Sequence, residues 1–361
     1  MIHKGGSLIK KHGIWFIALF VLLVMAATGC SYNDAPVITT EASHGKIFLY
    51  GENHGSETAL SRELTLWQGY YNEDGMRHLF VELPYYTAEY LNLFMQAEDD
   101  AILEEIYQDW AGSHAHSTAI KDFYRQIKET CPETVFHGTD VGHQYDTTGA
   151  RYLAYLESRD MEDTIQYTLA KQAIEQGRTF YGRNDYEYRE NRMVENFVRE
   201  FDGLSGESIM GIYGAAHTAV DSMAYNSEDI PSMACQLYQR YADALHSVNL
   251  KEMIEPLRTD IIEIKGKSYQ AAYFGKQDLS AIFPDYMHRE FWRLENSYAD
   301  FESHPKTGDV LPYDNFPVFV ESNQVFVIDY TLKNGEIQRK YYRSDGTQWQ
   351  GEFCTEEFTI E

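Results

Sequence analysis

Three apolar runs of this sequence are each followed by residues with acid–base chemistry. Such runs indicate buried strands, and open α/β sheets bind their ligands beyond the carboxyl ends of parallel strands. We therefore expect two carboxylates and two imidazoles to meet at one sheet edge. These residues are Glu52 and His54 after residues 46–50, Glu82 after residues 78–81, and His217 after residues 208–213 and a Gly-Ala-Ala segment.

Glu52 and His54 are two residues apart, so in an extended segment their side chains point the same way. Gly51 and Gly55 flank them and permit the tight backbone of a strand-to-helix corner. An imidazole beside a carboxylate can act as a general base or acid. The structural alternative, a helix cap next to a hydrogen-bonded core imidazole, stays open on these residues alone.

A divalent metal would suit the same four side chains. Two imidazoles and two carboxylates can hold Mn, Co, Zn or Fe with an open position for water. The residue types do not choose between water held by a metal and water activated by an imidazole. The metal ligands would be Glu52, His54, Glu82 and His217.

A helix predicted over residues 185–201 carries Arg189, Met193 and Asn196 at i, i+4 and i+7, on one face. There Arg189 and Asn196 can orient a carboxylate or stabilise an oxyanion. The alternative is a solvated helix face with ion pairs that involve Glu190.

Between residues 46 and 256 the sequence alternates apolar strand-like runs with helical stretches. This pattern predicts an α/β fold with a mostly parallel central sheet flanked by helices. A further strand over residues 134–137 leads to Asp140, another carboxylate past a strand end. Helices are predicted over residues 56–71, 87–96, 117–129, 148–176 and 185–201.

Residues 257–361 have a different sequence pattern, with alternating apolar and polar positions and Gly-containing turns. They predict a β-rich C-terminal extension or small domain. Its strands are expected over residues 260–264, 268–274, 317–320, 324–331, 337–343 and 349–354.

Residues 1–29 combine three lysines with an apolar run, as secretory signal peptides do. They end in Ala-Thr-Gly before Cys30, which resembles a bacterial lipobox. The resemblance implies cleavage, acylation of Cys30, and anchoring of the protein by lipid on the extracytoplasmic face of the cell membrane. Residues 30–45 would then form a tether, although an uncleaved anchor remains an alternative.

Removing residues 1–29 takes away Lys4, Lys10 and Lys11 and no acid, so 27 basic residues face 56 acidic ones, a net charge of −29. Such a charge disfavours nucleic acid as a partner. It mildly favours neutral or cationic ligands. Three further cysteines, Cys131, Cys235 and Cys354, allow one disulfide and one free thiol, with the pairing undetermined.

Five short motifs in this order resemble the superfamily of erythromycin esterases, ChaN-like haem-uptake proteins and TIKI/TraB proteases. The resemblance covers about residues 46–220 and does not reach the β-rich region. The erythromycin-esterase branch usually has two residues between the Glu and His of the first motif, and this chain has one, as in the haem-uptake branch. Residues 138–140, Gly-Thr-Asp, instead resemble the esterases, so the branch stays open. The motifs are residues 51–57, 80–82, 136–140, 189–196 and 214–217.

The resemblance implies a hydrolase that acts on an ester, amide or peptide bond of a small molecule or peptide. His54 would be the general base, Glu52 and Glu82 would orient it, and Arg189 and His217 would stabilise negative charge. The alternative is a lipoprotein that binds haem or another iron carrier without catalysis. Substrate-binding candidates are Asp140, Asn196 and Arg62.

Overall fold

The computed structural model describes residues 45–280, 283–349 and 352–360. Its first sheet has the strand order β3-β2-β4-β1-β5, and all neighbouring strands run parallel. The predicted α/β class with a parallel central sheet is thereby confirmed. The strands are β1 (Ile47–Glu52), β2 (His78–Pro84), β3 (Val135–Asp140), β4 (Ile209–Gly214) and β5 (Leu245–Asn249).

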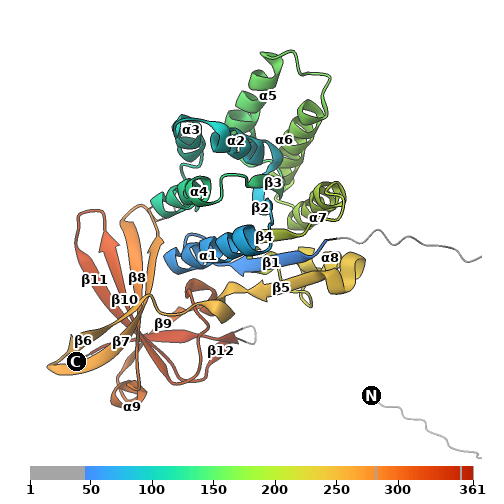
Figure 1. The fold of residues 1–361 in the computed structure, drawn as a ribbon. Helices are drawn as coiled ribbons and strands as arrows, with labels where there is room; N and C mark the ends of the chain where they lie inside the picture. The colour runs from blue at the N-terminus through green and yellow to red at the C-terminus, as the bar shows by residue number, and fades with distance from the viewer. Residues whose placement is uncertain (1–44, 281–282, 350–351, 361) are drawn as a thin grey trace, which may run out of the picture. The chain divides into compact units, whose positions relative to one another are not determined.

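Helices cover both faces of this sheet (Figure 1). Alternate strand residues pack on opposite faces, with Tyr50 in one core cluster and Leu49 in the other. One cluster includes α1 (Glu57–Glu73), α2 (Tyr85–Gln96), α3 (Ala101–Asp109) and α4 (Thr118–Thr130). The other includes α7 (Tyr186–Asp202) and α8 (Met233–Tyr241).

The single helix predicted over residues 148–176 is wrong. The chain forms a π-helical turn, η1 (Tyr145–Gly149), then α5 (Ala150–Glu157) and, after a break, α6 (Ile165–Arg183). Asp160 in the break has φ = 56°, a left-handed conformation that ends a helix. Thr164 then caps α6 by accepting a hydrogen bond from the Tyr167 amide.

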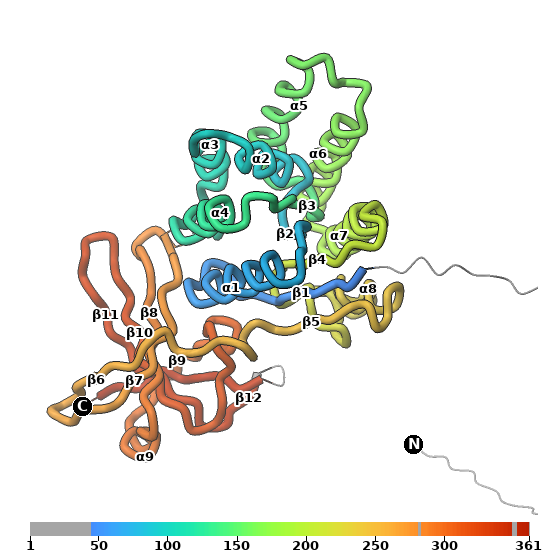
Figure 2. The backbone as a smooth tube through the Cα atoms, in the orientation of Figure 1, coloured from blue at the N-terminus to red at the C-terminus, as the bar shows by residue number. Residues whose placement is uncertain are grey.

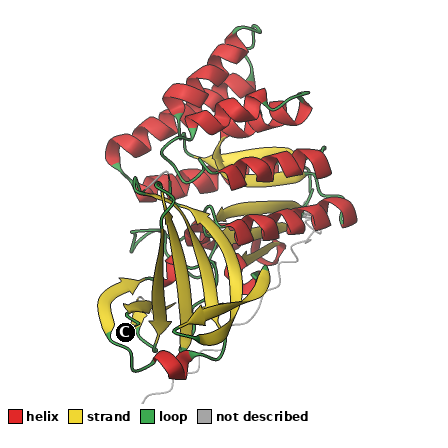
Figure 3. Cartoon of the chain, turned by 90° about the vertical axis from the view of Figure 1, so that its left-hand side faces the viewer, coloured by secondary structure: helices red, strands yellow, loops and turns green. Residues whose placement is uncertain are grey.

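After β5 the backbone enters a second, antiparallel sheet (Figures 2 and 3). Its strand order is β6-β7-β8-β10-β11-β14-β9. The β-rich C-terminal region is thus confirmed as a separate sheet. Its strands are β6 (Arg258–Ile264), β7 (Lys267–Asp278), β8 (Tyr286–Leu294), β9 (Lys306–Leu311), β10 (Gln324–Leu332), β11 (Ile337–Ser344) and β14 (Thr355–Phe358).

Two strands predicted for this region differ from the structure. Residues 317–320 are irregular, although Val318 and Val320 are buried in a core cluster of this sheet. Residues 349–354 contribute to a small hairpin of β12 (Gln348–Trp349) and β13 (Glu352–Phe353). The remaining helical turns are η2 (Ala215–His217), η3 (Ala242–Ala244), η4 (Leu250–Met253), α9 (Tyr298–Phe301) and η5 (Tyr313–Asn315).

The predicted signal peptide, Cys30 and residues 31–44 of the predicted tether lie outside the described residues. Within the described ranges, no helix combines the length and apolar character needed to cross a membrane. Cys131, Cys235 and Cys354 are all free thiols, so the disulfide that the sequence allowed among them is absent from this part of the chain.

Candidate functional site

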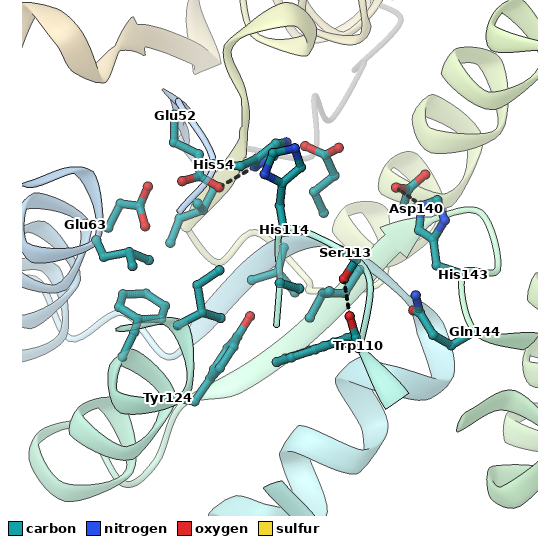
Figure 4. Close-up of a pocket in the computed structure, with 18 of the residues that line it drawn as sticks. Glu52, His54, Glu63, Trp110, Ser113, His114, Tyr124, Asp140, His143 and Gln144 are labelled. Atoms are coloured by element: carbon teal, nitrogen blue, oxygen red, sulfur yellow. Dashed lines mark hydrogen bonds and ion pairs between the residues drawn. The ribbon is translucent and has the colours of Figure 1, made fainter. Parts of the chain in front are cut away.

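A cavity of about 320 Å³ opens at the carboxyl edge of the parallel sheet. Its size is at the lower end of small-molecule sites. Figure 4 shows Glu52 and Glu63 on one side of it and Asp140 and His143 on the other. The residues that line it are Glu52, His54, Leu60, Glu63, Val81, Glu82, Leu83, Trp110, Ser113, His114, Ala115, Ile120, Phe123, Tyr124, Asp140, His143, Gln144, Tyr181, Arg189 and Ile212.

Glu52 holds the His54 ring in place. Glu52 is the last residue of β1, and its Oε1 lies 2.8 Å from His54 Nδ1. The two side chains therefore point the same way, as their spacing predicts. A carboxylate in this position fixes the tautomer of the imidazole, with the proton on Nδ1, and leaves Nε2 as the second reactive nitrogen.

Gly214, at the end of β4, allows the His54 ring to lie against the backbone. A Cβ at this position would stand 3.0 Å from His54 Nε2 and 3.3 Å from Glu82 Oε2. The Gly214 amide also donates a hydrogen bond of 2.6 Å to Glu82 Oε2. The glycine thus brings the ends of three strands into contact.

Arg189 on α7 joins two carboxylates near the carboxyl ends of the neighbouring strands β2 and β3. Its guanidinium donates to both oxygens of Asp140, at 3.0 and 2.6 Å, and to Glu82 Oε1 at 2.5 Å. The three side chains are 15%, 1% and 12% exposed. Bidentate geometry at a buried site gives strong, directional charge-assisted bonds.

His217 lies behind this cluster and does not line the cavity. Its Nδ1 is 2.7 Å from Glu190 Oε2, and its Nε2 faces Glu82 Oε1 at 3.6 Å. Glu190 is buried and also accepts from the Met233 amide. The interpretation of Glu190 as part of a solvated helix face is therefore wrong. His217 contacts two residues that do line the cavity, Glu82 and Arg189.

The charges of the site stabilise one another. Burial lowers the pKa of His54, but the carboxylates of Glu52 and Glu82 outweigh it and raise the pKa to about 9. Burial raises the pKa of Glu82, but the positive charges of His217 and Arg189 outweigh it and hold the pKa at about 2. Burial lowers the pKa of His217, yet Glu82 and Glu190 raise it overall. At neutral pH His54 is therefore mostly cationic.

The three predicted substrate-binding residues have different positions. Asp140 lines the cavity, but Asn196 and Arg62 are not among the lining residues. Asn196 is buried and donates to the Thr139 carbonyl at 3.1 Å, because α7 packs over β3 and brings this amide beneath the strand. Arg62 lies on α1, and its Nε is buried without a hydrogen-bond partner in the described structure.

Two histidines with a weak signal in the sequence also line the cavity. His143 Nε2 is 2.8 Å from Asp140 Oδ2, so Asp140 connects this ring to Arg189. The His114 ring lies 6.2 Å from that of His54 between centroids. Neither residue belongs to the five motifs.

Glu63 is the carboxylate among the described lining residues that sequence reasoning missed. It is only 1% exposed on α1, and no hydrogen bond joins either of its oxygens to another described residue. Leu60, Leu64 and Trp67 share its buried helix face at helical spacing. A carboxylate at a position where the apolar periodicity demands a hydrophobic residue was the available signal.

The second sheet holds the loop that carries His54. Gln277 on β7 donates from its side-chain amide to the His54 carbonyl at 3.2 Å, and Arg289 holds Gln277 Oε1 at 2.7 and 2.9 Å. Asn53 donates at 2.8 Å to the Asp314 carbonyl. The loop between β1 and α1 is therefore fixed by residues more than 200 positions later in the chain.

The candidate metal ligands do not form a metal centre in this geometry. Among the described residues, no group of three or more His, Cys, Asp or Glu side chains is arranged to hold an ion. Glu82 is paired with Arg189, and the Nδ1 atoms of His54 and His217 are paired with carboxylates. A guanidinium between the carboxylates also opposes a second cation.

Neither a protein-family model nor a curated protein matches the chain. Solved structures with some likeness include a Bacillus cereus protein (14% identity, 60% of this chain and 68% of that one, TM-score 0.41). Others are a succinoglycan biosynthesis protein (14%, 56% and 65%, 0.42) and an erythromycin esterase in its open conformation (12%, 58% and 70%, 0.41). These values are too low to assign a family or an activity.

Proposed function

We propose that this protein is a hydrolase that activates water at His54 to cleave an ester, amide or peptide bond. The observation that carries this function is the contact of 2.8 Å between Glu52 Oε1 and His54 Nδ1 at the wall of the cavity. A carboxylate-held imidazole beside a fixed guanidinium supplies both proton transfer and charge stabilisation.

The protonation state of His54 determines how the proposed hydrolysis proceeds. With a pKa of about 9, His54 is neutral in about 1% of molecules at pH 7, and the neutral fraction rises with pH. Neutral Nε2 takes a proton from water as the water oxygen bonds to the carbonyl carbon. Arg189 stabilises the resulting oxyanion. The imidazolium then protonates the leaving oxygen or nitrogen as its bond to carbon breaks.

A covalent acyl-enzyme is not supported by the lining residues. The sequence has no GxSxG elbow. Ser113, whose hydroxyl lines the cavity, donates to the Trp110 carbonyl at 2.7 Å, so no base takes its proton. Water is therefore the nucleophile in this scheme.

The first test is hydrolysis by the full-length protein of a panel of aryl and alkyl esters, amides and short peptides. His54→Asn should reduce kcat/KM by about 10³-fold while the thermal unfolding temperature changes little. An unchanged kcat/KM in this variant would contradict the assignment of His54.

The pH–rate profile gives a sharper test of the same assignment. Because neutral His54 is the base, kcat/KM should rise with pH to a plateau above about 9. Glu52→Gln removes a carboxylate that raises this pKa, so the midpoint should move to lower pH by about one unit or more. A midpoint that does not move would show that another group titrates.

The alternative of haem binding would need the same ring nitrogen, His54 Nε2, that serves as the base in the hydrolase. Both nitrogens of His217 face side chains of the protein. Titration with haemin, followed by Soret absorbance, separates the two functions, since a hydrolase of this design should give no saturable band.

We also propose that lipid on Cys30 anchors the protein on the extracytoplasmic face of the cell membrane and that nucleic acid is not a partner. The lipobox-like residues and the acidic composition support this. Metabolic labelling with an alkyne fatty acid should mark the protein, and Cys30→Ala should abolish the label and release the protein from membranes. Labelling of this variant would contradict lipidation at Cys30.

A further inference from the structure

The acidic side of the cavity contains two carboxyl groups that each have a buried oxygen without a hydrogen bond to another described residue. Glu63 Oε1 and Glu52 Oε2 are both buried, and neither has a hydrogen-bond partner among the described residues. Both residues line the cavity, and Figure 4 shows them on the same side of it. A buried acceptor without a donor costs free energy, so these oxygens fit a ligand that brings donors of its own.

The wall beside them is aromatic and apolar. Trp110, Phe123 and Tyr124 are at most 6% exposed and line the cavity together with aliphatic side chains. Aromatic ring faces attract an ammonium group, and the rest of the wall suits a hydrocarbon body. A charged head with an apolar body therefore matches this side of the cavity.

The remaining charge of the cavity favours a cation. Four carboxyl groups line it, from Glu52, Glu63, Glu82 and Asp140, whereas Arg189 is the sole lysine or arginine among the lining residues of the described structure. Arg189 is already committed to Asp140 and Glu82 on the opposite side. On the side with Glu52 and Glu63, the cationic His54 is paired with Glu52 Oε1, which leaves Glu52 Oε2 and Glu63 Oε1 without a partner among the described residues.

We infer that Glu52 and Glu63 bind the protonated amine of a substrate whose adjoining part is apolar or aromatic. N–H groups of an ammonium can donate to both free carboxyl oxygens, which a quaternary ammonium cannot do. The inference rests on the proposed function only in naming the ligand a substrate, because amine binding itself requires no turnover.

Glu63 should lose a proton when the amine binds. Burial and the neighbouring charge of Glu52 raise the pKa of the Glu63 carboxyl well above its ordinary value, so the empty cavity favours its protonated form more than water does. Binding should therefore strengthen as pH rises toward this pKa. The other titratable groups that share the cavity are Glu52, His54, Glu82, His114, Tyr124, Asp140, His143, Tyr181 and Arg189.

Calorimetric titration of the full chain with 2-phenylethylamine and with 2-phenylethanol tests the site. The two probes share their body and differ in the cationic head. The amine should bind at least about tenfold more tightly, as a charged hydrogen bond to a buried carboxylate predicts. It should also release protons at pH values below the pKa of Glu63, measured in buffers of different ionisation enthalpy. Equal affinities for the amine and the alcohol would overturn the inference.

Glu63→Gln is the matching variant, since the amide keeps the shape and removes the ionisable group. It should abolish the preference for the amine and leave the affinity for 2-phenylethanol within about twofold. Glu89→Gln is the control, because Glu89 is a partly buried carboxylate on α2 that bonds to Tyr152 and does not line the cavity. A preference retained in Glu63→Gln, or lost in Glu89→Gln, would count against the site.

The two proposals fail separately. Selective amine binding without hydrolysis of any ester, amide or peptide would remove the hydrolase and leave the amine site. Hydrolysis that requires His54 but shows no preference for amine-bearing substrates would remove the amine site alone. His54→Asn should lose turnover and still bind 2-phenylethylamine.

Discussion

The parallel and antiparallel sheets contribute to the cavity in different ways. All described lining residues lie between Glu52 and Ile212, so they belong to the parallel sheet, its helices and its loops. The antiparallel sheet supplies none of them. It supplies instead the hydrogen bonds from Gln277 to the His54 carbonyl and from Asn53 to the Asp314 carbonyl.

The parallel sheet thus carries the reactive side chains, and the antiparallel sheet helps to hold one of their loops in place. The ends of parallel strands bring charged side chains together because these ends share one edge of the sheet. The loop that carries His54 has little regular structure of its own, and an antiparallel bridge between Ser56 and Gln277 joins it to the second sheet. Rigid support from a neighbouring element is what a precise acid–base site requires.

The largest effect is expected at the guanidinium that joins two strands of the parallel sheet. Arg189→Met should lower the free energy of unfolding by about 3–5 kcal/mol, because Asp140 and Glu82 would remain buried without the cation that bonds to both. Urea denaturation monitored by circular dichroism measures this change. Arg192→Met on the same helix is the control, since its ion pair with Glu195 is more exposed and should contribute at most about 1 kcal/mol. Similar losses in both variants would contradict a special role for Arg189.

A smaller effect is expected in the antiparallel sheet. Gln277→Leu should reduce kcat about tenfold with little change in KM, because the His54 loop loses a fixed contact and shifts. Gln277→Glu keeps an acceptor for Arg289 but has no donor for the His54 carbonyl, so it should show the same loss.

Gln270→Leu is the control for this comparison. Gln270 lies on the same strand as Gln277 and is exposed. If all three variants retained the parent kcat, the second sheet would have no part in positioning His54. If Gln270→Leu lost activity equally, the effect would reflect the stability of the sheet.

The parallel sheet could be predicted from the sequence because its strands are apolar runs that end in chemically distinctive residues. Glu52, His54, Glu82, Asp140 and Arg189 indeed lie together at one cavity. Helix boundaries were less predictable. The break between α5 and α6 depends on a left-handed Asp160 and on the cap at Thr164, which a periodic pattern does not reveal.

The support from the antiparallel sheet could not be predicted in the same way. Gln277 is an uncharged residue in an alternating strand, and it acts on a loop 223 residues earlier. Local patterns carry no information about such pairs. Glu63 is an intermediate case, because its place on the apolar face of α1 is visible in the sequence but its exposure to a cavity is not.

The smallest effect concerns stability and distinguishes the unpaired acid from the paired ones. The raised pKa of Glu63 means that the folded protein holds its proton more tightly than the unfolded chain does. Its contribution to stability is therefore fully present below the ordinary glutamate pKa and is lost as pH rises toward the raised value.

Glu63→Gln cannot ionise, so its unfolding temperature should match the parent at acidic pH and exceed it by a few degrees at alkaline pH. Differential scanning fluorimetry from acidic to alkaline buffers measures the difference. Glu82→Gln should show the opposite trend, because the pKa of Glu82 is lowered to about 2 and its ionised form stabilises the fold. If both variants instead unfolded at lower temperatures than the parent at alkaline pH, both carboxyl groups would be stabilising in their ionised form. The contrast between the two sides of the cavity would then disappear.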